Sequence, residues 1–148
     1  FPSLNNAKVI NIHMQGGAMG NLKSAIFNNE RRDLRDLALN EKKLWAFNKN
    51  VGDYNYKIGN LKLAEIVILR CWNDTRWHHT MHLHGHHFWV TSKEFEDLEI
   101  DLLRDTYLMQ PGEKADLVFI ANNPGKWLFH CHMLEHNASG MIGYLSVN

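Results

Sequence analysis

The sequence lacks several features that would define a simple functional class. No apolar stretch approaches the roughly 20 residues that span a bilayer, so a transmembrane helix is excluded. Sixteen basic and 16 acidic residues leave no formal net charge, and bulk electrostatics therefore favours neither nucleic acid nor an anionic membrane. The chain has no initiator methionine and no signal-peptide pattern, and we expect a processed chain or a fragment of a longer protein.

Cysteine is scarce, with Cys71 and Cys131 the only two in the sequence. Two cysteines can form a disulfide or serve as small buried hydrophobes, and they do not define the redox compartment. Cys71 shares strand parity with Val67 and Leu69, so we expect it in the core. Cys131 stands between two histidines, where a metal-bound thiolate is the better interpretation.

The remaining composition indicates one globular domain over residues 1–148. Apolar residues make up 45% of the chain, and neither an internal repeat nor a low-complexity linker interrupts it. Leucine and alanine recur at helical spacing among charges in residues 21–50, which predicts one or two short amphipathic helices. From residue 61 onward the pattern is all β. One strand is expected near the N-terminus, at residues 7–14. The others are expected at residues 63–72, 80–92, 104–109, 114–121, 126–132 and 141–147, and short strands at this spacing suit an antiparallel sandwich or barrel.

Histidine is concentrated in two short segments. Nine of the ten histidines lie in residues 78–87 or 130–136. Successive side chains of a strand point to opposite faces, so His130 and His132 should face one way and Cys131 the other. In the first segment His82, His84 and His86 share a face, and His79 falls outside that parity. This distribution points to metal chemistry with two centres on one strand.

The first centre is indicated by the spacing after Cys131. His136 and then Met141 follow, with four residues between each pair. A further histidine would complete a set of two histidines, one cysteine and a weak axial methionine, which is typical of blue-copper electron-transfer sites. We choose His79 as that histidine. A zinc site, or Met141 as core packing, is the alternative, but zinc would not need the spaced methionine or the flanking histidines.

The second centre is indicated by two His-x-His pairs, His82 with His84 and His130 with His132. If their strands are neighbours, four imidazoles converge on one surface. Solvated surface histidines are the alternative, but imidazoles crowded together without a metal would repel one another on protonation.

These motifs resemble those of the multicopper oxidases. Residues 79–86 are similar to the family's H-x-x-H-x-H-G-H motif, and residues 130–141 to its H-C-H-x-x-x-H-x-x-x-G-M motif. Residues 104–106 and 123–129 also resemble the family. The resemblance is clear over residues 61–148 and weaker over 1–60, where the helical stretch is interpreted as a subgroup insertion. It implies an all-β cupredoxin fold, a Greek-key sandwich or barrel, with a short helical segment near the N-terminus.

The resemblance also implies a ligand set and a reaction. It assigns four residues to a type 1 copper: His79, Cys131, His136 and Met141. It assigns His82 to the type 2 copper of a trinuclear cluster, and His84, His130 and His132 to its type 3 pair. The implied reaction takes single electrons from a reducing small molecule or metal ion and passes them through Cys131 to the cluster, where dioxygen becomes water.

The chain supplies four of the eight cluster histidines that the family uses. The resemblance therefore implies a C-terminal cupredoxin domain of a laccase-like oxidase, with one or more N-terminal cupredoxin domains as partners and a periplasmic or secreted location. Alone, the chain is expected to bind type 1 copper without reducing dioxygen. Two alternatives stay open, a stand-alone blue-copper electron carrier and a homo-oligomer that binds copper through facing half-clusters.

Several polar residues are candidates to support the expected ligands. Metal-bound histidines usually bond a second group through the other ring nitrogen, and Asp105, Asn73 or Asp74, and Glu135 are candidates for that role. The alternatives are turn or strand-end residues for the first three and a solvent-exposed charge for Glu135. Many bacterial members of the family carry a carboxylate after the second type 1 histidine that helps to deliver protons. This chain has Asn137 there, and a neutral amide cannot act as the acid.

Overall fold

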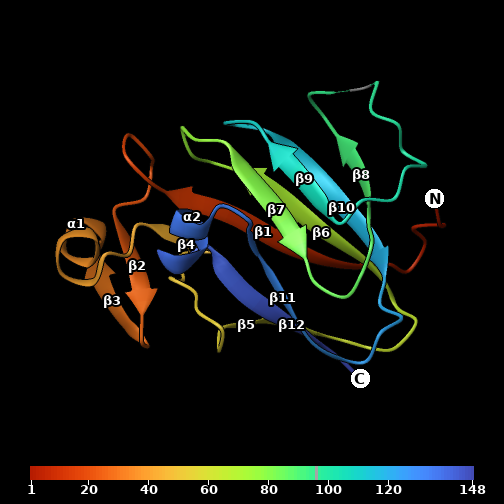
Figure 1. Ribbon diagram of the computed structural model, residues 1–148, viewed down its shortest axis with the longest axis horizontal. Helices are drawn as coiled ribbons and strands as arrows, with labels where there is room; N and C mark the ends of the chain where they lie inside the picture. Colours follow the sequence, from red (N-terminus) through yellow and green to blue (C-terminus); the bar gives the residue numbers. More distant parts are fainter. Residues whose placement is uncertain (96) are drawn as a thin grey trace.

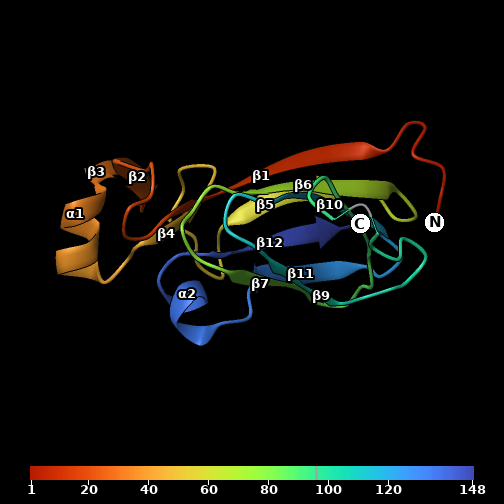
Figure 2. The same ribbon diagram turned by 90° about the horizontal axis from the view of Figure 1, so that it is seen from above.

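Two five-stranded sheets pack face to face in this computed structural model, which describes residues 1–95 and 97–148. Figure 2 shows the two layers edge-on. Strands β1 and β6, and strands β5 and β12, pair in parallel, and the other neighbours are antiparallel. The first sheet has the order β4 (Trp45–Phe47), β1 (Lys8–Gly16), β6 (Ile66–Asn73), β10 (Lys114–Ile120), β8 (Trp89–Ser92). The second has the order β5 (Lys57–Leu61), β12 (Ile142–Val147), β11 (Gly125–Cys131), β7 (His79–Leu83), β9 (Thr106–Met109).

The core lies between the sheets and follows from strand alternation. In β6, Val67, Leu69 and Cys71 are buried, whereas Arg70 and Trp72 are exposed on the outer face. The expectation that Cys71 is a core residue is thus confirmed, and its thiol is free. Each fully buried leucine or phenylalanine contributes about 1.5–3 kcal/mol through the hydrophobic effect. The largest such side chains include Phe47, Phe88, Phe119, Phe129, Leu69, Leu83 and Leu117.

The short helical segment predicted near the N-terminus is present, but it is much shorter than the predicted range of residues 21–50. Only residues 34–41 are helical, and a two-stranded hairpin precedes them at one end of the sandwich (Figure 1). The hairpin forms because Asn28 and Asn29 both adopt positive φ, as tight hairpin turns require. The elements of this region are β2 (Ser24–Phe27), β3 (Glu30–Asp33), α1 (Leu34–Asp36) and the π-helical turn η1 (Leu37–Glu41).

Three further elements differ from the expectation. The single strand predicted at 80–92 is two strands, β7 and β8, because the chain turns at Gly85, where φ is +72°. Strand β5 and the short helix α2 (Leu134–Ala138) were not expected, since neither carries a clear periodic pattern. No helix in residues 1–95 or 97–148 is long and apolar enough to cross a membrane.

Strand pairing brings the two histidine segments together. Strand β7 lies between β11 and β9, with His82 opposite His130 and Met81 opposite Cys131. Helix α2 follows β11 directly and begins the loop that returns to β12 (Figure 1). The second sheet therefore carries both groups of candidate ligands.

Candidate metal centre

Three candidate ligands from three elements meet at one end of the second sheet. His79 begins β7, Cys131 ends β11 and His136 lies on α2. One ring nitrogen of each histidine and the sulfur of Cys131 all lie within 4.8 Å of one another. Cys131 Sγ is 3.6 Å from His136 Nδ1. The structure thus brings together residues separated by more than fifty positions in the sequence.

Met141 is held beside this group by the backbone. The Cys131 N–H donates to the Met141 carbonyl at 3.1 Å, and the Met141 N–H donates to the His136 carbonyl at 3.0 Å. The Met141 side chain is fully buried in the core cluster that includes Cys131. The loop after Cys131 therefore folds back on the cysteine, and the role of Met141 as an axial ligand stays a prediction.

Burial sets the protonation state of the three ligands. It lowers the pKa of His79 to about 3, with smaller contributions from His136 and His78. It also lowers the pKa of His136, against the opposing charge of Glu135. Both imidazoles are therefore neutral near pH 7 and offer lone pairs. Burial raises the pKa of the Cys131 thiol, so the thiolate needs a bound cation.

Trp45 forms a wall of the site that the sequence did not reveal. Its ring lies 4.7 Å from the ring of His79 and 4.7 Å from that of His136, measured between centroids. A Cβ at Gly140 would lie 2.1 Å from the Trp45 carbonyl oxygen, so this contact requires a glycine. Trp45 shields the two imidazoles from water. Its place in an apparently helical pattern concealed this role.

The four histidines of the expected half-cluster also converge. Ring centroids of His82 lie 4.8 Å from His84, 5.7 Å from His130 and 5.5 Å from His132. His84 Nε2 and His130 Nε2 are only 2.9 Å apart. The pKa of His84 and that of His130 are lowered, mainly by burial, so the pair is neutral near pH 7. The assignment of these residues to cluster coppers stays a prediction.

Hydrogen bonds orient two of these rings. His82 Nδ1 lies 2.9 Å from the Asp105 carbonyl oxygen and 3.0 Å from Thr106 Oγ1. His130 Nδ1 donates to the carbonyl oxygen of Cys131 at 2.7 Å. Since both Nδ1 atoms are engaged, the Nε2 atoms of His82 and His130 are the ring nitrogens that could bind a metal.

The expected supporting residues contact the histidines through other atoms, or in other ways, than the sequence indicated. Asp105 was expected to act through its carboxylate, but its main-chain carbonyl contacts His82, while the carboxylate accepts from Thr106 Oγ1 at 3.0 Å. Glu135 is exposed on α2 and acts on His136 only through its charge. Asn137 Nδ2 donates to the Cys131 carbonyl at 3.0 Å.

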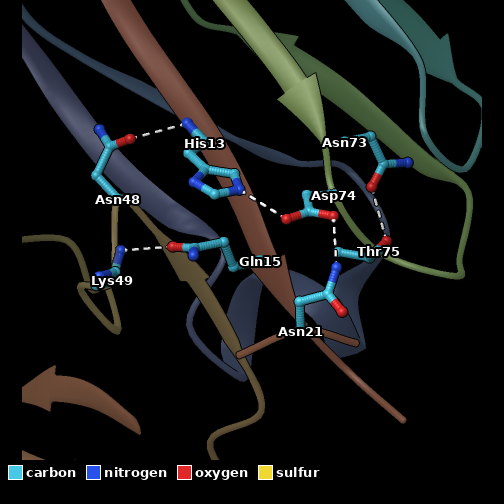
Figure 3. Close-up of polar contacts among 8 residues, drawn as sticks. All are labelled: His13, Gln15, Asn21, Asn48, Lys49, Asn73, Asp74 and Thr75. Carbon is cyan, nitrogen blue, oxygen red and sulfur yellow. Dashed lines mark hydrogen bonds and ion pairs between the residues drawn. The ribbon is translucent and has the colours of Figure 1, made fainter. Parts of the chain in front are cut away.

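Asn73 reaches the first centre through a residue that sequence reasoning missed. It is fully buried at the end of β6 and bonds Thr75, as Figure 3 shows. Thr75 Oγ1 lies 3.0 Å from His79 Nε2. No motif surrounds Thr75, so only the folded chain identifies it.

The residues present fit a soft metal ion. Among the described residues, the buried His79 Nδ1 has no hydrogen-bond partner, and a metal would satisfy it. A cysteine sulfur with two imidazole nitrogens is a donor set that suits copper. A two-sheet Greek-key sandwich with such a group at one end is a cupredoxin domain.

Comparison with known proteins defines the family. Residues 20–148 match the family model described as multicopper oxidase. The multicopper oxidase mco of Staphylococcus epidermidis is 33% identical over 111 residues, covering 74% of this chain. The iron multicopper oxidase fer1 of Mycosarcoma maydis is 36% identical over 95 residues, covering 55% of it. The chain belongs to the multicopper oxidase family, whose members are copper-dependent oxidoreductases.

Solved structures agree on the fold. The McoA multicopper oxidase of Aquifex aeolicus superimposes over 100% of this chain with a TM-score of 0.72 and 22% sequence identity. The chain spans 31% of that protein, 20% of the Staphylococcus relative and 15% of the Mycosarcoma relative. The matched region is therefore a minor part of each relative.

Proposed function

We propose that this chain is a C-terminal cupredoxin domain of a laccase-like multicopper oxidase, which accepts electrons at a type 1 copper and passes them to a trinuclear cluster. The proposal assigns His79, Cys131, His136 and Met141 to the type 1 copper. It assigns His82, His84, His130 and His132 to half of the cluster. One or more N-terminal cupredoxin domains would supply the other half.

One observation carries the proposal. Cys131 belongs to the first group, and its neighbours His130 and His132 belong to the second. The Cys131 carbonyl also accepts the hydrogen bond from His130 Nδ1, so a second short path parallels the covalent one. A metal-binding protein without internal electron transfer does not need a covalent link between the two groups of ligands.

Each residue group has a distinct task in this function. When bound, copper supplies one-electron redox chemistry at Cys131 and the four-electron reduction of dioxygen at the cluster. Trp45 excludes water from the imidazoles of the first group. Asn137 holds α2 against the Cys131 carbonyl and cannot donate a proton as an acid, so protons must come from another group.

The reducing substrate is proposed as a small molecule or a metal ion. The name of the Mycosarcoma relative contains iron, which supports the metal-ion alternative for that protein. A periplasmic or secreted location is proposed from the family resemblance. Secretion of the intact protein from its source cells would test this.

Copper analysis of the chain tests the assignment of Cys131. After copper loading and removal of excess metal, we expect one tightly bound copper per monomer. Cys131→Ser should lose it, whereas Cys71→Ser, the matched control at the other buried cysteine, should keep it. Equal copper retention by both variants would refute the proposal.

Two other functions predict different results. A copper-binding homo-oligomer would carry more than one copper per chain and elute as an oligomer. A stand-alone electron carrier would be encoded without an upstream H-x-H-G motif. The four converged histidines favour the oxidase, since a simple carrier does not need them.

A further inference from the structure

The side-chain amide of Asn73 has one possible orientation. Its Nδ2 lies 2.8 Å from the Trp77 carbonyl oxygen and 2.9 Å from the Gln110 carbonyl oxygen. Carbonyl oxygens only accept hydrogen bonds, so the NH₂ group must face them. The Asn73 oxygen Oδ1 then faces the hydroxyl of Thr75 at 2.7 Å.

The hydroxyl of Thr75 must in turn accept from His79. Asn73 Oδ1 only accepts, and two oxygens 2.7 Å apart with no hydrogen between them would repel, so the hydroxyl hydrogen is given to Asn73 Oδ1 or shared with the Trp77 carbonyl at 3.1 Å rather than given to His79. In both cases only lone pairs of Thr75 Oγ1 remain for His79 Nε2, which lies 3.0 Å away. His79 Nε2 therefore carries the ring hydrogen, and Nδ1 carries the lone pair.

In this tautomer the unprotonated nitrogen, Nδ1, is the one left to face Cys131 and His136. Nε2 is engaged by Thr75, so Nδ1 is the nitrogen that His79 offers beside Cys131 and His136. Among the described residues Nδ1 is buried without a hydrogen-bond partner. A ring in the other tautomer would place an N–H there, and that hydrogen would block coordination.

We propose that Asn73 and Thr75 select the tautomer of His79 that leaves Nδ1 free to bind metal, which makes Thr75 a positioning residue of the first centre. This inference rests on the proposed function of that centre. It adds that the tautomer of the buried His79 is set before the metal binds.

The neighbouring residue Asp74 holds the segment in place. Its carboxylate contacts His13 Nε2 at 2.9 Å and accepts from Asn21 Nδ2 at 3.1 Å (Figure 3). Its own N–H donates to the Met14 carbonyl at 3.0 Å. These contacts tie the segment to β1, so Thr75 keeps its position against His79 without help from a metal.

Ring-nitrogen NMR shifts of the metal-free 148-residue chain test the tautomer directly. We expect His79 to be protonated at Nε2 in the wild type, and a Nδ1-protonated ring would overturn the proposal. This measurement needs no copper, so it decides the inference even if the proposed function of the site fails. Conversely, a normal blue copper site with a Nδ1-protonated metal-free ring would refute this inference alone.

Variants at Thr75 test the consequence for metal binding. Thr75→Val removes the hydroxyl, and we expect copper affinity, measured by chelator competition, to fall about 10- to 100-fold. Thr75→Ser should restore it, and Thr91→Val on β8, away from the site, should leave it unchanged. An affinity of Thr75→Val equal to that of Thr91→Val would contradict the proposal. If Thr75→Val does not fold, a Thr75→Ser chain with its His79 ring protonated at Nδ1 would contradict it as well.

Discussion

At the scale of single residues, burial prepares His79 for a metal more than any charge does. The side chain has no exposed surface, and its pKa is lowered to about 3, with burial as the main cause. Burying an imidazole nitrogen that has no hydrogen-bond partner costs free energy of folding. The hydrogen bond between the other ring nitrogen and Thr75 offsets part of that cost. The same burial predicts how the metal-free chain responds to acid.

We predict that the metal-free chain loses stability as pH falls below about 6.5, the ordinary pKa of histidine. Between that value and pH 3 the unfolded chain binds a proton at His79 that the folded chain does not. The free energy of unfolding therefore falls by about 1.4 kcal/mol per pH unit through His79 alone. Urea unfolding at several pH values should give a shallower pH slope for His79→Gln than for His87→Gln, a change at an exposed histidine. Equal slopes would contradict this.

At the scale of elements, the turn after β7 directs His84 toward β11. Gly85 has φ +72°, and a Cβ there would lie 2.5 Å from the ring of Trp127. Trp127 cannot easily move, because its Nε1 donates to the Asn123 carbonyl at 2.8 Å. The end of β7 and the start of β11 are thus joined by a close contact that only glycine permits.

Alanine substitutions at two glycines distinguish the free-energy cost of a clash with Trp127 from the cost of left-handed backbone. Gly112 also has positive φ, +80°, but nothing lies within 4 Å of its missing Cβ. Gly112→Ala should cost about 1–2 kcal/mol from left-handed backbone alone. Gly85→Ala should cost about 1–3 kcal/mol more from overpacking. Free energies of unfolding from urea titration measure both, and equal costs would show that Trp127 moves aside.

Local patterns indicated which candidate ligands the fold brings together, but not the residues around them. Strand alternation within short segments indicated the two groups of candidate ligands, whereas the pairing of His82 with His130 was only a condition at that point and comes from the fold. Trp45 contacts His79 only because the fold brings β4 to this end of the second sheet. Thr75 lies just four residues before His79, but no motif indicates that the segment between β6 and β7 turns its hydroxyl toward the ring. The hairpin at residues 24–33 was missed because the helical spacing of Leu34 and Leu37, which do lie in the helical segment, was extended to the residues before them, where Asn28 and Asn29 form a tight turn.

At the scale of the whole molecule, the chain brings together two groups of candidate ligands. The first contains His79, Cys131 and His136, and the second has four converged imidazoles, which we propose to be half of a trinuclear cluster. The chain also spans only 20% of the Staphylococcus relative. We therefore propose that this chain accepts electrons and that oxygen reduction needs its assembly with a partner domain.

We predict that the copper-loaded 148-residue chain shows no catalytic oxygen uptake in the presence of a reducing phenol, aromatic amine or metal ion. Four imidazoles cannot hold three copper ions in the arrangement that dioxygen reduction needs. An oxygen electrode measures the rate, with free copper at the same concentration as the control. Sustained uptake by the monomeric chain would contradict the prediction.

The visible absorption spectrum of the copper-loaded chain shows whether a cysteine thiolate, two histidines and a methionine of this chain form a type 1 copper site. We expect an intense blue band that Cys131→Ser abolishes and Cys71→Ser retains. A chain that binds copper tightly but stays colourless, or a blue band that survives Cys131→Ser, would contradict it.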